Sequence, residues 1–211
     1  KFEVAIKKTR IDLKHNLARV YLGKKDFSSS KKLLLELLEE TPPTDLAPFY
    51  MNLISIAVLE KEFVLAKEYL QKVKDSKTEI NYNLDLTESY ILSEIGRPKE
   101  ALAILDKSSA VTGQILYKKA TLNFVLGNLD TATKQLEKAI GKEPEKATYY
   151  TLMAEILLHK QQYEEAAEYA LTSIEIIKYF PKAHLILGQA LEKLGDLENA
   201  KVAYEMANSL K

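Results

Sequence analysis

An internal repeat constrains the fold of this chain more than any local feature does. The stretches LGNLDTATKQLEKAIGKEP and LGDLENAKVAYEMANSL follow one pattern, in which Gly127 and Gly195 occupy the same place. In both, an alanine follows the glycine after five positions, at Ala132 and Ala200. A pattern that recurs at a fixed period indicates stacked copies of one structural unit, so it bears on the architecture of the whole chain.

The same pattern occurs six times along the 211 residues. Each copy has a turn residue five positions before a small residue: Lys25 and Ser30, Lys61 and Ala66, Gly96 and Ala101, Gly127 and Ala132, Gln161 and Ala166, Gly195 and Ala200. The small residues are separated by 36, 35, 31, 34 and 34 positions. Each copy also holds two stretches of helical apolar periodicity, such as YYTLMAEILL and EEAAEYALTSIEII. The sequence therefore predicts helical hairpins that repeat at about 34 residues.

The residues around these positions resemble the tetratricopeptide repeat (TPR) family. Residues 147–180 carry the pattern well, with Tyr150, Met153, Ala154, Leu157, Tyr163, Ala166 and Ala170. Residues 181–211 carry it in His184, Leu187, Gly188, Leu191, Leu197, Ala200, Tyr204 and Ala207. Further copies are predicted at 11–46, 47–81, 82–112 and 113–146, of which 82–112 is degenerate. Residues 1–10 are interpreted as the second helix of a truncated preceding repeat.

The resemblance implies an all-α fold, a right-handed superhelical solenoid of antiparallel helix pairs in one continuous repeat domain. In such an array the first helix of each pair lines a concave surface. We also interpret the chain as the TPR region of a larger bacterial protein, because it begins at Lys1 and shows no signal peptide.

Composition and motifs argue against several classes of function. Thirty basic residues balance thirty acidic ones, so no overall charge favours nucleic acid. The absence of cysteine is compatible with a reducing compartment such as the cytoplasm, but the sequence leaves the compartment open. His15, His159 and His184 lie far apart at non-equivalent repeat positions, and no nucleophile motif surrounds the serines. We therefore expect no enzyme activity, no cofactor, no metal and no membrane insertion.

The resemblance implies a non-enzymatic interaction scaffold that binds a peptide or helix of another protein in its concave groove. The candidate binding residues are Asn16, Arg19, Asn52, Tyr90, Tyr117, Lys118 and Phe124. The same frame places Asp12, His15, Met51, Ser55, Leu86, Thr121, Thr151, Glu155, Lys182 and Gln189 on this face. Asparagine amides can hold a peptide main chain through a donor and an acceptor, and aromatic rings anchor interfaces.

Two other functions are weighed against this one. The family's carboxylate clamp for chaperone tails needs lysine and arginine at set positions, but Ile186 occupies an arginine position and the set is incomplete. The stretch YFPKAHLILGQALEKLGDLENA is similar to TPR tails that follow hydrolase domains in some bacterial proteins. The alternative function is therefore an accessory or regulatory region of a longer enzyme whose catalytic domain is absent from this chain. We also expect self-association through the C-terminal helix, since no polar capping helix follows it.

Overall fold

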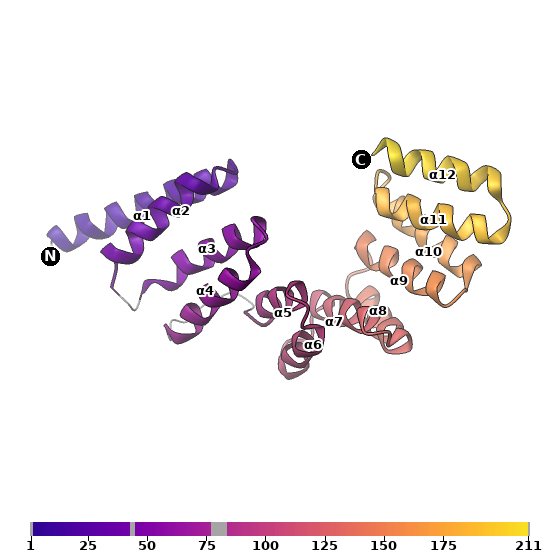
Figure 1. Cartoon of the computed structure of the whole chain (residues 1–211), viewed down its shortest axis with the longest axis horizontal. Helices are drawn as coiled ribbons and strands as arrows, with labels where there is room; N and C mark the ends of the chain where they lie inside the picture. The colour runs from indigo at the N-terminus through magenta and orange to yellow at the C-terminus, as the bar shows by residue number, and fades with distance from the viewer. Residues whose placement is uncertain (1, 43–44, 77–83, 211) are drawn as a thin grey trace. The chain divides into compact units, whose positions relative to one another are not determined.

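The described residues form twelve α-helices. The computed structural model describes residues 2–42, 45–76 and 84–210, and within them no strand is found. The order of the helices along the chain is shown in Figure 1. The helices are α1 (Phe2–Gly23), α2 (Phe27–Glu40), α3 (Ala47–Leu59), α4 (Phe63–Asp75), α5 (Leu84–Glu94), α6 (Pro98–Lys107), α7 (Gly113–Val125), α8 (Leu129–Lys142), α9 (Ala147–His159), α10 (Tyr163–Ile176), α11 (Pro181–Leu194) and α12 (Leu197–Ser209).

Successive helices pack as pairs, as the repeat predicts. Helices α1 and α2, α3 and α4, α7 and α8, α9 and α10, and α11 and α12 make the hairpin contacts, and the second helix of a pair also packs against the first helix of the next. The chain has an all-α fold of stacked helix pairs. Capping side chains begin several helices: the Asp26 carboxylate accepts from Ser29 N at 3.1 Å, and the Thr112 hydroxyl accepts from Ile115 N at 3.2 Å.

The turn residue of each repeat has a left-handed backbone. Gly96, Gly127 and Gly195 have φ of 80°, 79° and 84°. At the equivalent position the other three repeats carry Lys25, Lys61 and Gln161, whose φ values are 61°, 61° and 62°. A side chain in this conformation costs about 1–2 kcal/mol, because its Cβ crowds the following carbonyl group. The three glycine-free turns therefore store strain that the glycine turns avoid.

We expect Lys61→Gly to raise the free energy of unfolding by about 0.5–1 kcal/mol, because relief of the left-handed strain exceeds the entropic cost of glycine. Gly127→Ala is expected to lower it by about 1 kcal/mol for the same reason. Urea unfolding followed by circular dichroism measures both. Lys61→Ala is the control, since it keeps the Cβ and removes only the exposed part of the side chain beyond it. Equal effects of Lys61→Gly and Lys61→Ala would contradict the explanation.

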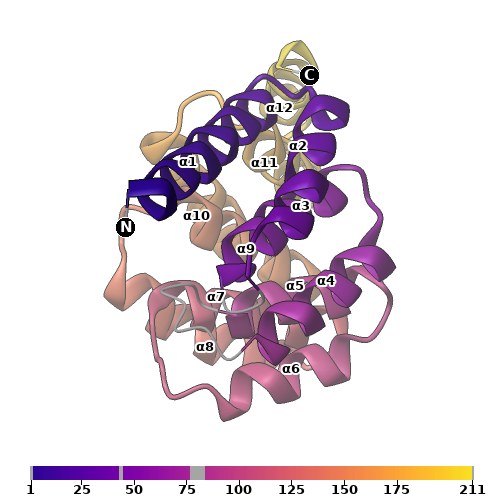
Figure 2. The same cartoon turned by 90° about the vertical axis from the view of Figure 1, so that its left-hand side faces the viewer.

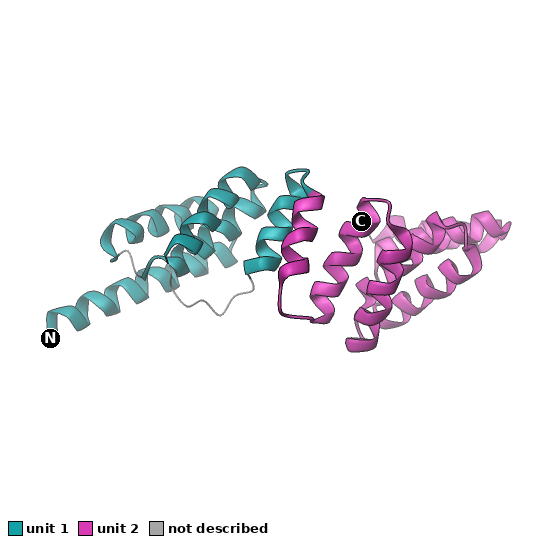
Figure 3. Ribbon diagram, turned by 90° about the horizontal axis from the view of Figure 1, so that it is seen from below, with its two compact units in different colours: residues 1–97 teal, residues 98–211 magenta. Residues whose placement is uncertain are grey.

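The described chain divides into two compact units, Lys1–Arg97 and Pro98–Lys211, coloured separately in Figure 3. The sequence predicts one continuous repeat domain, and the boundary falls inside its degenerate repeat 82–112, between α5 and α6. In that repeat, Asp85, Glu88 and Ser89 replace the usual apolar and small residues of the first helix.

Helix α1 differs from the sequence interpretation. Residues 1–10 were expected to be a separate second helix, but Phe2–Gly23 forms one helix of 22 residues with no turn between Arg10 and Ile11. The physical reason is local: no glycine or proline interrupts the sequence before Gly23. Figure 2 shows α1 as one continuous helix, and α2 packs on both α1 and α3.

Each unit has its own apolar core. In unit 1, Leu34 and Leu37 of α2 pack with Phe49, Leu53 and Ile56 of α3. Ala66, Leu70 and Val73 of α4 form a neighbouring cluster with Ile91 of α5. In unit 2 one cluster runs through α7 to α12, and it includes Leu136, Met153, Ile156 and Leu187. The small residues that define the repeat, such as Ala132 and Ala166, are fully buried because the paired helices approach closely there.

Candidate peptide-binding groove

The first helices of unit 2 line a hollow of about 240 Å³. Its walls come from α7, α9 and the start of α11: Tyr117, Thr121, Phe124, Val125, Thr148, Thr151, Leu152, Glu155, Phe180 and Lys182. The predicted binding residues Tyr117 and Phe124 are among them, as are Thr121, Thr151, Glu155 and Lys182 from the same predicted face. The helical repeat explains this result, since residues at one repeat position face one side of the stack.

Aromatic rings support the hollow from behind. Tyr117 stacks on Tyr149 with the ring centroids 4.9 Å apart, and Phe124 packs edge-on against His159 at 5.1 Å. Burial raises the pKa of the Tyr117 hydroxyl, so this ring stays neutral at physiological pH. The Tyr149 hydroxyl donates to Glu143 Oε2 at 2.9 Å. The rings are thus held in place before any ligand arrives, which lowers the entropy cost of binding.

An ion pair lies at the edge of the hollow. Lys182 Nζ is 2.6 Å from Glu155 Oε2, and the lysine side chain remains about half exposed. The Thr121 hydroxyl donates to the Tyr117 carbonyl at 2.9 Å, and Thr151 shares a buried hydrogen bond of 2.7 Å with Ser173. An apolar wall beside an exposed ammonium suits an apolar side chain with an acidic neighbour.

In unit 1, the predicted groove residue Asn52 is already hydrogen-bonded. Its side-chain amide donates to Nε2 of His15 at 2.7 Å, and His15 packs edge-on against Phe49 at 4.9 Å. Burial, together with the nearby Arg19 charge, lowers the pKa of His15, although Asp12 opposes this. The neutral imidazole therefore accepts from Asn52 at physiological pH, and one amide hydrogen of Asn52 remains for a ligand.

The other predicted residues lie on the first helices α1, α5 and α7. Asn16 and Arg19 are exposed on α1. Tyr90 of α5 is partly exposed and packs edge-on against Phe63 at 6.2 Å. Lys118 lies on α7 beside Tyr117 but does not line the hollow. A role of these residues in binding a ligand stays a prediction.

A second hollow, of about 720 Å³, lies between α1 and the start of α3 in unit 1. Asp12 and His15 from the predicted face line it, with Lys7, Lys8 and Thr41. The Thr41 hydroxyl is buried and has no hydrogen-bond partner among the described residues.

Sequence reasoning missed several lining residues of the unit 2 hollow. Phe180 lies at the N-cap of α11, immediately before Pro181, and so outside the helix frame used for prediction. Thr148 lies in the first turn of α9, at the repeat position of Lys182 and Asp12. That equivalence was the available signal for Thr148. For Phe180 the only signal was its place beside a helix-starting proline.

The comparisons with known proteins agree with this geometry. Residues 117–177 and residues 181–211 each match a family model described as a tetratricopeptide repeat. The chain is also 29% identical over 118 residues to tetratricopeptide repeat protein 21B of Xenopus laevis. That match covers 53% of this chain and 9% of the Xenopus protein, so the chain spans a small part of its relative. Residues 117–177 and 181–211 are therefore tetratricopeptide repeats.

Solved structures of TPR solenoids share the fold. PilW, described as a widely conserved type IV pilus biogenesis factor, aligns with a TM-score of 0.79 and 16% identity, over 92% of this chain and 90% of that one. PilF of Pseudomonas aeruginosa aligns with a TM-score of 0.74 and 18% sequence identity. The alignment covers 97% of this chain and 99% of PilF. YrrB, described as a TPR protein with an unusual peptide-binding site, aligns with a TM-score of 0.62 and 20% sequence identity. The alignment covers 87% of this chain and 95% of YrrB. At these identities the likeness shows the fold alone.

Neither family model names a catalytic family. In the described part of the chain, no group of three or more histidine, aspartate or glutamate side chains is arranged to hold a metal ion. Across residues 2–42, 45–76 and 84–210, no helix combines the length and apolarity that crossing a bilayer requires.

Proposed function

We propose that this TPR protein is a non-enzymatic interaction scaffold that binds a peptide or short helix on the groove face of its first helices. The observation that carries the proposal is the unit 2 hollow, where the rings of Tyr117 and Phe124 lie beside the Glu155–Lys182 ion pair. A hollow of about 240 Å³ has the size for one bulky apolar side chain of a ligand. Tetratricopeptide arrays act by binding other proteins, which supports the same function.

The chemistry of this face defines the ligand class. The ligand presents one leucine, phenylalanine or methionine to the hollow and an acidic residue to Lys182 or Lys118. In unit 1 we expect the remaining amide hydrogen of Asn52 and the exposed side chains of Asn16 and Arg19 to contact the main chain of the ligand. We expect micromolar affinity, about 8 kcal/mol, because an unstructured ligand loses entropy when it becomes ordered.

A peptide selected on the intact chain from a random peptide library is the probe. Tyr117→Ala is expected to weaken its affinity at least tenfold, or about 1.4 kcal/mol, because the ring forms one wall of the hollow. Asn52→Ala reports in the same way on unit 1. Tyr163→Ala is the matched control, since Tyr163 is half-buried on the second helix α10.

Fluorescence polarisation measures the affinities, and circular dichroism confirms that each variant is folded. Equal affinities for the wild type, Tyr117→Ala and Asn52→Ala would mean that ligands use another face. A similar loss in Tyr163→Ala would show that the effect comes from altered packing rather than from the hollow.

A further inference from the structure

Helix α1 is apolar on two opposite faces. One face packs on α2 through Ile11, Ala18 and Leu22. The opposite face carries an apolar stripe of Phe2, Ile6, Leu13, Leu17 and Val20, which are 81%, 56%, 64%, 44% and 51% exposed. These residues recur at helical spacing and form a single row along the helix. Exposed apolar rows of this length mark interaction surfaces.

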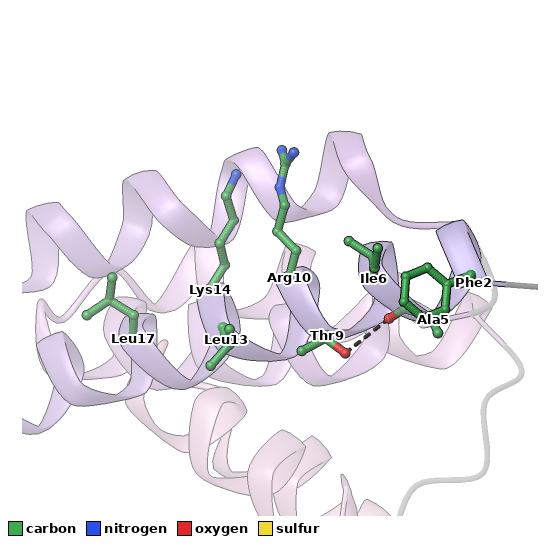
Figure 4. Close-up of a pocket in the computed structure, with 8 residues that line it drawn as sticks. All are labelled: Phe2, Ala5, Ile6, Thr9, Arg10, Leu13, Lys14 and Leu17. Carbon is green, nitrogen blue, oxygen red and sulfur yellow. Dashed lines mark hydrogen bonds between the residues drawn. The ribbon is translucent and has the colours of Figure 1, made fainter.

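Figure 4 shows part of this stripe, with Leu13, Leu17, Ile6 and Phe2 along the helix and Arg10 and Lys14 extending along one edge. A surface hollow of about 540 Å³ follows the row. Arg10 and Lys14 reach Glu40 of α2 at 3.1 Å and 2.7 Å. These ion pairs fix the basic edge in place next to the apolar row.

The repeat register identifies what this face is built to receive. Leu13, Leu17 and Val20 lie 17, 13 and 10 positions before Ser30, and the same positions before Ala66 are Phe49, Leu53 and Ile56. Those three α3 residues are at most 4% exposed, because Leu34 and Leu37 of α2 cover them. In α9 the equivalent residues, Tyr149, Met153 and Ile156, are buried in the cluster that holds Leu136 and Ala139 of α8. The stripe on α1 therefore has the chemistry of a stacking face for the second helix of another pair.

The charge of α1 specifies the partner further. Helix α1 is basic, whereas the whole chain is neutral. It has two acidic residues, Glu3 and Asp12, and five basic ones, Lys7, Lys8, Arg10, Lys14 and Arg19. The helix is also longer than the other first helices, which have 11 to 14 residues. At 1.5 Å per residue, 22 residues give a surface about 33 Å long.

We propose that the exposed stripe of α1 docks an amphipathic helix of a partner protein, one with an apolar row and acidic flanks. This helix lies on α1 as α2 lies on α3. Its apolar row covers Leu13, Leu17 and Val20 and continues to Phe2, and its acidic flank meets Arg10, whose side chain is 64% exposed beside the row. The site is separate from the groove face, so it stands or fails independently of the proposed function.

A second copy of the chain fits this face less well. Two α1 helices packed antiparallel bring like edges together, so Arg10 and Lys14 of one copy face those of the other. The C-terminal helix offers a mixed surface, on which the apolar residue Val202 is 56% exposed. In α10, Ala167 and Ile174 pack in the unit 2 core. At the equivalent repeat positions α12 carries Lys201 and Asn208. Self-association through α12 stays a prediction, and these residues do not support it.

Two synthetic peptides as long as α1 test the proposal on the intact chain. Both carry leucine at the spacing of the α1 stripe, and their flanks are glutamate in one and lysine in the other. We expect the glutamate peptide to bind with a dissociation constant of about tens of micromolar, and the lysine peptide at least tenfold more weakly. The double variant Leu13→Glu and Leu17→Glu is expected to lose at least tenfold in affinity for the glutamate peptide. Val64→Glu, at a 69% exposed residue of α4, is the matched control and keeps the affinity.

Circular dichroism verifies the fold of each variant. We expect the double variant to fold, because Leu13 and Leu17 are both exposed. Equal binding of the two peptides, or binding that survives the double variant, overturns the proposal. Two further assays test other occupants of the stripe: sedimentation tests for a second copy of the chain, and vesicle binding tests for a membrane surface. Self-association that the double variant abolishes would assign the stripe to a second copy. Binding to phosphatidylserine vesicles that the same variant abolishes, without peptide binding, would assign it to a membrane surface.

Discussion

Replacing Leu136 with alanine is expected to lower the free energy of unfolding by about 2–5 kcal/mol. Leu136 is 0% exposed and belongs to the unit 2 core with Met153 and Ile156. The substitution removes buried methyl groups and leaves a cavity that the rigid helix pairs fill only in part. A loss of this size is a large fraction of the stability of an ordinary domain.

Urea unfolding followed by circular dichroism measures this loss. Leu197→Ala is the matched control, because the same side chain is removed from a position that is 67% exposed. We expect the control to change stability by less than about 0.5 kcal/mol, as surface substitutions usually do. Equal effects of the two variants would mean that the α8 position is not part of a packed core.

The helix pairs were predictable because repeat spacing constrains packing and turns together. A small residue recurs at Ala66, Ala132 and Ala166 because two helices meet there, and each is fully buried. The turn position five residues earlier proved left-handed even where it is Lys25, Lys61 or Gln161. The repeat frame detected these turns without glycine, because stacking imposes the same backbone on every copy.

The start of α1 was not predictable from the same frame. The spacing of Phe2 and Ala5 fits any amphipathic helix, so the frame did not distinguish a separate helix from a longer one. The decisive feature is the missing turn signal before Gly23, together with an apolar row that continues from Phe2 to Val20. The sequence period assigns faces to a helix, whereas its ends depend on local capping and turn residues.

The sequence predicted which helix face the groove residues lie on, but it did not predict their hydrogen-bond partners. Tyr117, Phe124 and Glu155 line the hollow because their repeat positions face one side of the stack. Asn16 and Asn52 occupy equivalent positions, yet only Asn52 has a histidine within hydrogen-bond distance, since His15 precedes it by one repeat and one residue. Repeat equivalence carries no information on such pairs, because they depend on neighbours that differ between copies.

Ion pairs show the same limit. Glu88 and Lys119 share a repeat position in neighbouring repeats, so repeat equivalence alone would suggest that they pair with each other. Within its own unit, Glu88 contacts Lys74 at the end of α4, and Lys119 contacts Asp106 of α6. Both partners lie on the preceding second helix, which is the helix that covers this face. A charge at this position is therefore compensated by the stacking helix of its own unit.

The last helix pair carries a glycine whose role a substitution can isolate. Gly188 of α11 occupies the repeat position that Ala154 has in the preceding repeat. Tyr204 of α12 faces Gly188 and occupies the repeat position of Ala170. A Cβ added at Gly188 would lie 2.7 Å from Cδ1 and Cε1 of the Tyr204 ring. That ring is held by its hydroxyl, which donates to Glu192 Oε2 at 2.7 Å. Burial and this hydrogen bond raise the pKa of Tyr204 to about 12, so the donor persists at physiological pH.

Two effects of opposite sign therefore compete in Gly188→Ala. Helix propensity favours alanine by about 1 kcal/mol, whereas overpacking a fitted interface costs about 1–3 kcal/mol. Because the ring is held by its hydrogen bond, we expect the clash to dominate and the free energy of unfolding to fall by about 1–2 kcal/mol. In a Tyr204→Ala background the clash disappears, and the same substitution should raise stability by about 1 kcal/mol. Urea unfolding of the four proteins gives the double-mutant cycle. An effect of the same sign in both backgrounds would show that the tyrosine ring does not select glycine at this position.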